Sequence, residues 1–590
     1  GVAFGDLNGD GFDDLVVGSP SANGIAGEVT VVYGKAGLRA SVVDLDTDGA
    51  LSPLGETRIL AAGVDQVLGS AVACGDFDAD GFDDLFIGAP GAGSGGQVLV
   101  VYGSETLPGT LIDLALAGSA TTILADEPQE SLGTSLASGD IDGDGFDDLL
   151  IGAPGATPFA NHRGGKVYVV YGNRTSRGTE LDLDTDEAIG PAGETRIFGE
   201  RDGDRAGSCV ASGDLNGDGF DDVVLGASRA DTLFTTDRGG AYIVYGRADL
   251  RARRIDLGTT LDHVGPAGET RLFGRGPNTW LGSDLATGDV DGDGFDDLLV
   301  SAAGVTGVGD NFAVGELYVF YGRSNLPGTT LDLRNPAGTY GETRITGTEE
   351  FGELGASLGL ADVNGDGFDD LVLGAPGSVP LGQVDDPVLQ DGLVFLYFGT
   401  PTLRGRQFID PRETANVAVL RDNAGDGLGQ TLAAGGDLDR DGVSEYAASA
   451  PGGDNPSLGG ENSTGSVVAL FGATSAPTLA RKEHSRAGDA PPRDFGPVAR
   501  GVVDAHAGTG SNETLTLLRS APALPHPPLA KLLPVHWQLA SDRDVPVFDV
   551  TLSYTDLELG TASEGRLAVY TSPTGAAGSW RRVAGGARSA

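Results

Sequence analysis

Cysteine, methionine and lysine are scarce in this chain. Its 590 residues include two cysteines, no methionine and four lysines, and no apolar run is long enough to span a bilayer. Cys74 and Cys209 cannot form a disulfide framework, and we predict that both are buried free thiols. Bases are also few, with 38 against 85 acids and a formal charge of −47. This excess of negative charge argues against nucleic acid as a partner, because phosphate binding relies on basic contacts.

The acids are concentrated in a repeated motif. DLNGDGFDD, from Asp6 to Asp14, recurs nearly unchanged six more times. The copies begin at Asp76, Asp140, Asp214, Asp289, Asp362 and Asp437. A small-residue strand precedes each copy, and an apolar run such as LFIGAP follows it. An alternating strand ending in Tyr-Gly or Phe-Gly comes next, and in six units a strand such as TRIL comes after that.

Each unit therefore reads as four short β-strands joined by glycine-rich turns. Four-stranded units repeated around an axis are the blades of a β-propeller, which typically has about 4–8 of them. A solenoid also stacks repeats, but its repeats are usually shorter, about 20–45 residues. We predict an all-β fold with a seven-bladed propeller over residues 1–472, a linker over 473–497, and a small β-sandwich-like domain, complete or incomplete, over 498–590.

The motif places oxygen ligands at alternate positions of a tight loop, as Ca²⁺ sites do. Glycine after the third ligand permits the turn. An EF-hand would need a Glu at loop position twelve and flanking helices, whereas here Val17 stands at that position and the flanks read as strands. The alternative to a metal site is a solvated acidic turn, which seven equivalent copies make improbable. We predict up to seven bound Ca²⁺ ions, one for each blade.

The expected ligands are the side chains at motif positions 1, 3, 5 and 9 and the backbone carbonyl at position 7. They are Asp6, Asn8, Asp10, Phe12, Asp14; Asp76, Asp78, Asp80, Phe82, Asp84; Asp140, Asp142, Asp144, Phe146, Asp148; Asp214, Asn216, Asp218, Phe220, Asp222; Asp289, Asp291, Asp293, Phe295, Asp297; Asp362, Asn364, Asp366, Phe368, Asp370; and Asp437, Asp439, Asp441, Val443, Glu445. The seventh set departs from the others at Val443 and Glu445, so it is the least secure.

These motifs, set in four-stranded units over roughly residues 1–472, resemble the FG-GAP repeats of integrin α-subunits. The resemblance implies a seven-bladed propeller with calcium in the hairpin between the first two strands of a blade, on the lower face. It also implies that partners dock on the upper face. The chain departs from the integrin pattern because all seven blades carry a calcium motif and no integrin accessory domain is visible. It looks like a bacterial relative.

The chain opens on an inner strand, GVAFGD, without the TRI-type strand that precedes each later inner strand. Either residues upstream of Gly1 complete the ring, which we favour, or a later segment such as residues 498–503 does so. The absence of an initiator Met and of a signal peptide indicates a processed form or a fragment. The acidic composition also fits a halophile.

Catalytic motifs are weak. GASLG (Gly355–Gly359) and GAGSGG (Gly91–Gly96) match hydrolase and dinucleotide patterns but lack the required helix. We therefore interpret the protein as a non-catalytic, secreted or cell-surface module that binds an extracellular protein or glycan, or other subunits of a surface assembly. Its variable upper-face loops would provide specificity. They are residues 154–165, 228–239, 303–315, 376–392 and 451–465. The alternative is a secreted hydrolase or lyase with a site on that face or on the axis.

Overall fold

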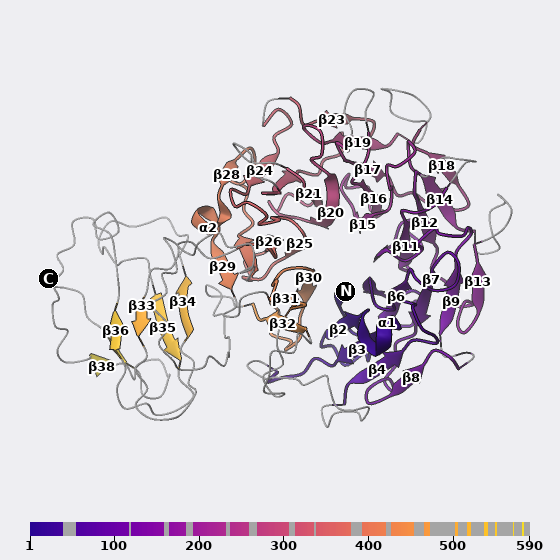
Figure 1. Ribbon diagram of the computed structural model, residues 1–590, viewed down its shortest axis with the longest axis horizontal. Helices are drawn as coiled ribbons and strands as arrows, with labels where there is room; N and C mark the ends of the chain where they lie inside the picture. The colour runs from indigo at the N-terminus through magenta and orange to yellow at the C-terminus, as the bar shows by residue number, and fades with distance from the viewer. Residues whose placement is uncertain are drawn as a thin grey trace.

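The protein is all-β, and a computed structural model shows a seven-bladed β-propeller (Figure 1). The structure describes residues 1–38, 55–116, 118, 120–157, 164–183, 193–231, 237–258, 268–305, 313–335, 338–378, 392–420, 426–452 and 465–472, together with six short strands beyond residue 501. Helix in these residues is limited to the single turns α1 (Ala22–Ile25) and α2 (Pro411–Thr414). Among them, no helix has the length and apolar character needed to cross a bilayer.

Each blade is an antiparallel sheet whose first strand ends at an acidic loop. Blades 1 to 3 contain β1 (Val2–Gly5), β2 (Asp14–Ser19), β3 (Glu28–Val32) and β4 (Thr57–Leu60); β5 (Val72–Gly75), β6 (Asp84–Ala89), β7 (Gln97–Val101) and β9 (Thr121–Leu124); and β10 (Ser135–Gly139), β11 (Asp148–Ala153), β12 (Lys166–Val170) and β14 (Thr195–Phe198). Blades 4 and 5 contain β15 (Cys209–Gly213), β16 (Asp222–Ala227), β17 (Gly240–Val244) and β19 (Thr270–Phe273); and β20 (Leu281–Gly288), β21 (Asp297–Ala302), β22 (Glu316–Phe320) and β24 (Thr343–Thr346). Blade 6 contains β25 (Leu358–Ala361), β26 (Asp370–Ala375), β27 (Leu393–Tyr397) and β29 (Val417–Leu420), and blade 7 contains β30 (Leu432–Gly436), β31 (Glu445–Ala450) and β32 (Ser466–Leu470).

A fifth strand, which the sequence patterns did not predict, joins five of the blades. It lies in the connection between the third and fourth strands of one blade and pairs in parallel with the outer strand of the preceding blade. The five strands are β8 (Leu111–Asp113), β13 (Glu180–Asp182), β18 (Arg254–Asp256), β23 (Thr330–Asp332) and β28 (Gln407–Ile409). Each covers an outer edge that would otherwise expose unpaired backbone groups.

Backbone hydrogen bonds close the ring between blades 7 and 1. The Asp13 amide donates to the Asp437 carbonyl at 3.2 Å, and the Lys35 amide donates to the Leu438 carbonyl at 2.9 Å. The bond made by Asp13 has a counterpart at each of the other six interfaces, including the one where Ser444 replaces aspartate. The ring therefore closes with blade 7 described as three strands.

Apolar clusters fill the space between consecutive blades. Phe77 and Phe86 of blade 2 pack with Leu149 and Tyr168 of blade 3, and all four side chains are fully buried. Burying each such side chain contributes about 1.5–3 kcal/mol. Both cysteines are free, as predicted, but only Cys209 is buried in one of these clusters, and Cys74 is partly buried.

Glycines allow the second strand of one blade to approach the segment that leads into the first strand of the next blade. A Cβ on Gly88 would lie 2.1 Å from the carbonyl oxygen of Gly133, which belongs to backbone and cannot move aside. We expect Gly88→Ala to destabilise the propeller by about 1–3 kcal/mol, the usual cost of overpacking, and to lower the Tm measured by scanning calorimetry. Gly276→Ala is the control, because no atom lies within 4 Å of its Cβ position. Equal Tm values for the two variants would contradict this account.

Three strand pairs are described beyond the propeller. They are β33 (Val502–Asp504) with β36 (Asp549–Thr551), β34 (Thr516–Ser520) with β35 (His536–Ala540), and β37 (Tyr570–Thr571) with β38 (Arg581–Arg582). β33 pairs with β36, whereas the sequence had suggested that a segment near it could complete blade 7. The predicted linker, residues 473–497, and most of the predicted sandwich lie outside the described residues, so the domain boundaries stay predictions.

Candidate metal centres

The acidic loops curl around the carboxylate at position 1. In blade 1, Asp6 accepts hydrogen bonds from the amides of Gly9, Asp10 and Gly11 at 2.7–3.1 Å. Gly9 and Gly11 both have φ in the left-handed region, at 71° and 81°, which glycine adopts without strain. The turn therefore favours glycine at both positions, although Ala79 and Arg440 adopt a left-handed φ at position 4 of two other copies.

Three of the five predicted ligand positions converge in each Asp-rich loop. The carboxylates at positions 1, 3 and 9 come within 4.8 Å of one another in four blades. These sets are Asp76, Asp78, Asp84; Asp140, Asp142, Asp148; Asp289, Asp291, Asp297; and Asp437, Asp439, Glu445. In blades 1, 4 and 6 the residue at position 3 is Asn8, Asn216 or Asn364, whose amide oxygen offers the same kind of ligand.

The carboxylate at position 5 lies apart from these sets. Asp10 and Asp80 are exposed or partly exposed, and one oxygen of each accepts the amide of the residue at position 7, at 3.0 and 3.2 Å. Asp144, Asp218, Asp293, Asp366 and Asp441 repeat this bond. Ligation by this carboxylate and by the position-7 carbonyl stays a prediction.

Buried oxygens without a hydrogen-bond partner test whether the loops fit a cation. Asp78 Oδ1, Asp142 Oδ1 and Asp291 Oδ1 are buried and make no hydrogen bond, and neither does Asp84 Oδ2. Leaving a buried charged oxygen unpaired is costly. Hard oxygen donors gathered in a tight loop fit Ca²⁺ or Mg²⁺, so these residues fit the predicted ion.

Burial also raises the pKa of the acid at position 9. The pKa of Asp14 is raised to about 8, first by desolvation and then by the charges of Asp6 and Asp10. Asp84, Asp148, Asp222, Asp297 and Asp370 are raised to about 8 in the same way. A nearby cation would lower these pKa values again, because it favours the charged form of the carboxylate.

The position-9 acid also ties the loop to the third strand of its blade. Asp14 accepts the Gly34 amide at 2.9 Å and the Leu7 amide at 3.1 Å. Glu445, the least secure of the predicted ligands, makes the equivalent bonds to Gly472 at 3.3 Å and Leu438 at 2.7 Å. The longer side chain is therefore accommodated in blade 7.

Two roles of the motif were missed in the sequence. The aspartate at position 8 reaches the preceding blade: Asp83 accepts the Asp6 amide at 2.8 Å, and Asp13 accepts the Asp437 amide at 2.7 Å, which helps to close the ring. The phenylalanine at position 7 also faces the preceding blade, since a Cβ on Gly9 would lie 2.5 Å from the Phe82 ring. The recurrence of both residues in six copies was the available signal, because alternate ligand spacing leaves position 8 unexplained.

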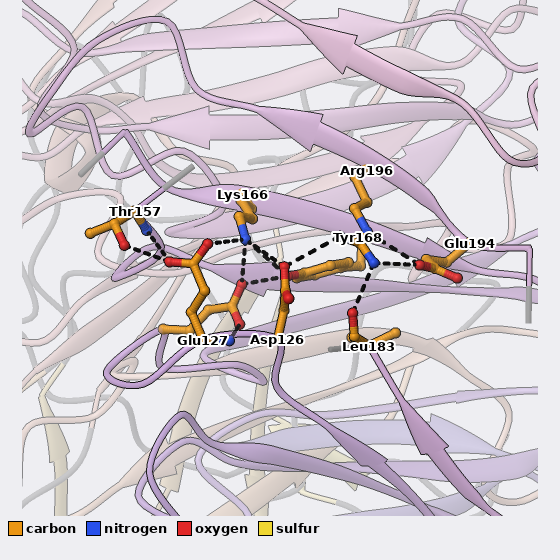
Figure 2. Close-up of polar contacts among 9 residues, drawn as sticks. Asp126, Glu127, Thr157, Lys166, Tyr168, Leu183, Glu194 and Arg196 are labelled. Carbon is orange, nitrogen blue, oxygen red and sulfur yellow. Dashed lines mark hydrogen bonds and ion pairs between the residues drawn. The ribbon is translucent and has the colours of Figure 1, made fainter. Parts of the chain in front are cut away.

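A buried polar network joins blades 2 and 3 (Figure 2). Lys166 Nζ lies 3.0 Å from Asp126, 2.8 Å from Glu127 and 3.4 Å from Glu130, and its side chain is 2% exposed. Tyr168 donates to Glu130 at 2.5 Å. Figure 2 shows Arg196 on the other side of Asp126, in contact with Asp126, Glu194 and the Leu183 carbonyl. The network is an interface between blades, and related Glu–Arg pairs recur at Arg271 and Arg344.

A cavity of about 420 Å³ lies among the inner strands. Small residues line most of it, including Ala3, Ala73 and Ser138. Its acids, Asp13 and Asp83, both accept backbone amides, so they already serve the blade interfaces. The central parts of the five predicted upper-face loops lie outside the described residues.

Comparison with known proteins agrees with this architecture. Six stretches match the model of the FG-GAP repeat, over residues 1–32, 68–101, 132–170, 206–245, 281–320 and 354–385. These stretches fall in blades 1 to 6, and the structure supplies the seventh blade. The protein is a seven-bladed β-propeller, and six of its blades contain FG-GAP repeats.

The chain is also homologous to integrin α-subunits. It is 30% identical over 243 residues to integrin α pat-2 of Caenorhabditis briggsae, and this match covers 38% of this chain and 17% of that protein. It is 27% identical over 462 residues to phosphatidylinositol-glycan-specific phospholipase D of Rattus norvegicus, and 27% identical over 453 residues to the Homo sapiens protein of that name. These two matches cover 73% and 72% of this chain, and the chain spans about half the length of each phospholipase.

The interpretation that the protein is not an enzyme is wrong. It rested on the absence of a catalytic motif, but relatives matched over nearly three quarters of the chain are named for an enzymatic activity. A fold does not decide whether a protein is catalytic, because chemistry is carried by sites that the same fold can gain or lose.

Proposed function

We propose that the propeller is a Ca²⁺-stabilised binding domain of an extracellular protein, with one ion in each blade. The observation that carries this proposal is the set of buried, unpartnered carboxylate oxygens in the acidic loops, such as Asp78 Oδ1 and Asp142 Oδ1. Extracellular modules bind calcium with Kd values of about 10⁻⁴–10⁻³ M. The calcium concentration outside cells is high enough to fill such sites, whereas the cytosolic concentration is not. The homology to integrin α-subunits supports a role in adhesion.

Partner binding would use the upper face, opposite the calcium loops. Connections between second and third strands, such as residues 376–392, differ most in sequence between blades, and specificity resides in variable loops on a rigid scaffold. The partner would be an extracellular protein or a glycan, including other subunits of a surface assembly.

The test is binding of the full chain to arrays of glycans and of extracellular matrix proteins in calcium. We expect at least one specific ligand, and we expect binding to be lost when residues 379–391 or another upper loop is replaced by a Gly-Ser linker. The Tm of each loop variant serves as the folding control. Binding that survives replacement of all five loops would contradict the proposed surface.

A second candidate function is hydrolysis of a phosphatidylinositol-glycan lipid. Relatives named for that activity match 73% and 72% of this chain, and this extent of similarity favours the second candidate. Release of a glycosylphosphatidylinositol-anchored reporter from vesicles by the protein would support it, and no release above a calcium-only control would exclude it.

A further inference from the structure

Arginines from one blade reach the acidic loop of the preceding blade. Arg177 of blade 3 lies at the Asp78 carboxylate of blade 2, with Nε 2.6 Å from Oδ2, and its Nη2 is 2.5 Å from Asp80 Oδ2. Its guanidinium also stacks 4.6 Å from the ring centre of Tyr102. Two carboxylates and one aromatic ring of blade 2 thus hold a single side chain of blade 3.

The same arrangement occurs at two more interfaces. Arg251 of blade 4 contacts Asp142 at 2.5 Å and Asp144 at 2.7 Å, and lies 4.6 Å from the centre of the Tyr171 ring. Arg404 of blade 6 contacts the equivalent groups of blade 5, which are Asp291, Asp293 and Tyr321. A contact repeated three times with the same atoms is a feature of the repeat.

The fifth strands, each of which pairs with the outer strand of the preceding blade, explain how these arginines reach the acidic loop of that blade. Arg177 lies three residues before β13, which pairs with β9 of blade 2. The pairing fixes the segment between the third and fourth strands of blade 3 beside the acidic loop of blade 2. Arg251 and Arg404 likewise precede β18 and β28, which pair with the preceding blades.

The type of residue at the position of Arg177 in each blade correlates with the type of residue at position 3 of the acidic loop that it faces. This residue stands five residues after the glycine that ends the third-strand motif. The blades whose loop has Asp at position 3 are followed by a blade with Arg, in the pairs Asp78–Arg177, Asp142–Arg251, Asp291–Arg404 and, by sequence, Asp439–Arg39. The blades whose loop has Asn are followed by a blade with Pro, in the pairs Asn8–Pro108, Asn216–Pro327 and, by sequence, Asn364–Pro477. Arg39 and Pro477 lie outside the described residues.

The pairing keeps the charge of each site constant. An Asp loop has one more negative charge than an Asn loop at position 3, and the arginine compensates for it. In three of the Asp loops the arginine binds one oxygen of the position-3 carboxylate, and the other oxygen is buried and unpartnered, at Asp78, Asp142 and Asp291. In two Asn loops the side-chain amide instead donates to the position-9 acid, at 3.3 Å for Asn216 and 2.9 Å for Asn364.

We propose that the propeller has two kinds of calcium site, and that Arg177, Arg251 and Arg404 are positioning residues of one kind. Each arginine orients the position-3 aspartate so that its free oxygen faces the ion, and each supplies the counter-charge that an Asn loop does not need. This inference deepens the proposed function and rests on calcium binding at the loops.

The test converts one kind of site into the other. In blade 2, Asp78→Asn leaves Arg177 with only one of its two carboxylate partners, Asp80, and removes a charged ligand. We therefore expect calcium at that site to bind about tenfold more weakly, since affinity follows ligand charge. The double variant Asp78→Asn/Arg177→Pro reproduces the pairing of blades 1 and 4, and we expect it to regain most of that affinity. The number of Ca²⁺ ions retained at stepped free calcium is read by native mass spectrometry.

The reverse conversion uses blade 4 in calcium-free buffer. Asn216→Asp adds a charge that no arginine compensates, so we expect a lower Tm, and Asn216→Asp/Pro327→Arg should recover at least half of the loss. A merely structural arginine would shift Tm equally with and without calcium and leave the ion count unchanged. Failure of both double variants to rescue overturns the inference. A wild-type protein that binds no calcium overturns the proposed function instead, and the calcium-free comparison still tests the charge pairing.

Discussion

Removing calcium at pH 8 is expected to lower the Tm of the propeller by more than 10 °C. Each site held at about 100 times its Kd contributes about 2.7 kcal/mol to the folded state. The entropy of unfolding is about 2.1 cal/mol/K for each residue, so 1 kcal/mol shifts the Tm of a propeller of about 470 residues by roughly 1 °C, and seven sites together give a shift above 10 °C. Without the ions, buried acids such as Asp14 and Asp84 face the other carboxylates of their loops. Differential scanning calorimetry of metal-free and calcium-loaded protein gives the shift.

The same samples give the stoichiometry. We expect up to seven Ca²⁺ ions for each chain, counted by native mass spectrometry. Magnesium at the same concentration is the control, because its smaller ion demands stricter geometry. Unchanged Tm and no retained metal would mean that the acidic loops are solvated turns, and the argument for an extracellular location would fall with them.

The calcium effect should depend on pH with a defined sign. In the metal-free protein, the pKa of Asp14 is about 8, above its ordinary value of 3.8. The folded state therefore binds more protons than the unfolded state between about pH 4 and pH 8, and stability falls as pH rises through this window. Calcium needs the deprotonated carboxylates, so its contribution grows with pH.

We accordingly expect the Tm difference between calcium-loaded and metal-free protein to be largest at pH 8 and smallest at pH 5. The metal-free sample should be prepared on a chelating resin, since soluble chelators lose affinity in acid. A difference that stays constant from pH 5 to pH 8 would show that the buried acids at position 9 do not govern calcium binding.

Lys166→Met is expected to destabilise the propeller by about 3–5 kcal/mol, because removing one partner of a buried ion pair leaves uncompensated charge. Lys166 is the common partner of Asp126, Glu127 and Glu130. Burial already raises the pKa of Glu130, and Lys166 opposes that shift. Without the lysine, Glu130 should take up a proton more readily, so the deficit in Tm should shrink between pH 8 and pH 5.

Lys35→Met is the matched control. Lys35 is the other lysine among the described residues, and it is exposed, so its substitution should change stability by less than about 0.5 kcal/mol. A loss for Lys166→Met no greater than that of Lys35→Met would show that the blade 2–blade 3 network contributes little. A deficit that is the same at pH 5 and pH 8 would remove Glu130 from the explanation.

The propeller and the place of its acidic loops could be predicted because they depend on short-range patterns. Seven copies of one motif, each between two short strands, specify the hairpin, and alternation and strand length specify the blade. The curl of the loop around Asp6 follows from the glycines at positions 4 and 6. Each of these features lies within a single repeat of the sequence.

Contacts between blades could not be predicted in the same way. β13 pairs with β9, although the two strands belong to different repeats, and its three residues give no periodic signal. The role of Arg177 becomes visible only after this pairing places it beside Asp78. The contacts of the Asp80 side chain with the Phe82 amide and with Arg177 were likewise not visible in the motif, and ligation at position 5 stays a prediction.

The fifth strands also bear on how such a ring can gain or lose blades. Each fifth strand completes the sheet of the preceding blade, as seen for β8, β13, β18, β23 and β28. A duplicated repeat therefore contains an outer edge that accepts a fifth strand, and it also contains a fifth strand that can pair with such an edge. An internal duplication of one repeat, roughly 64–75 residues in this chain, could then enter the ring without any new interface. We expect the number of blades in relatives to change by whole repeats. The acidic loop of one repeat would then face the arginine or proline of the next repeat, so the two would come from different copies.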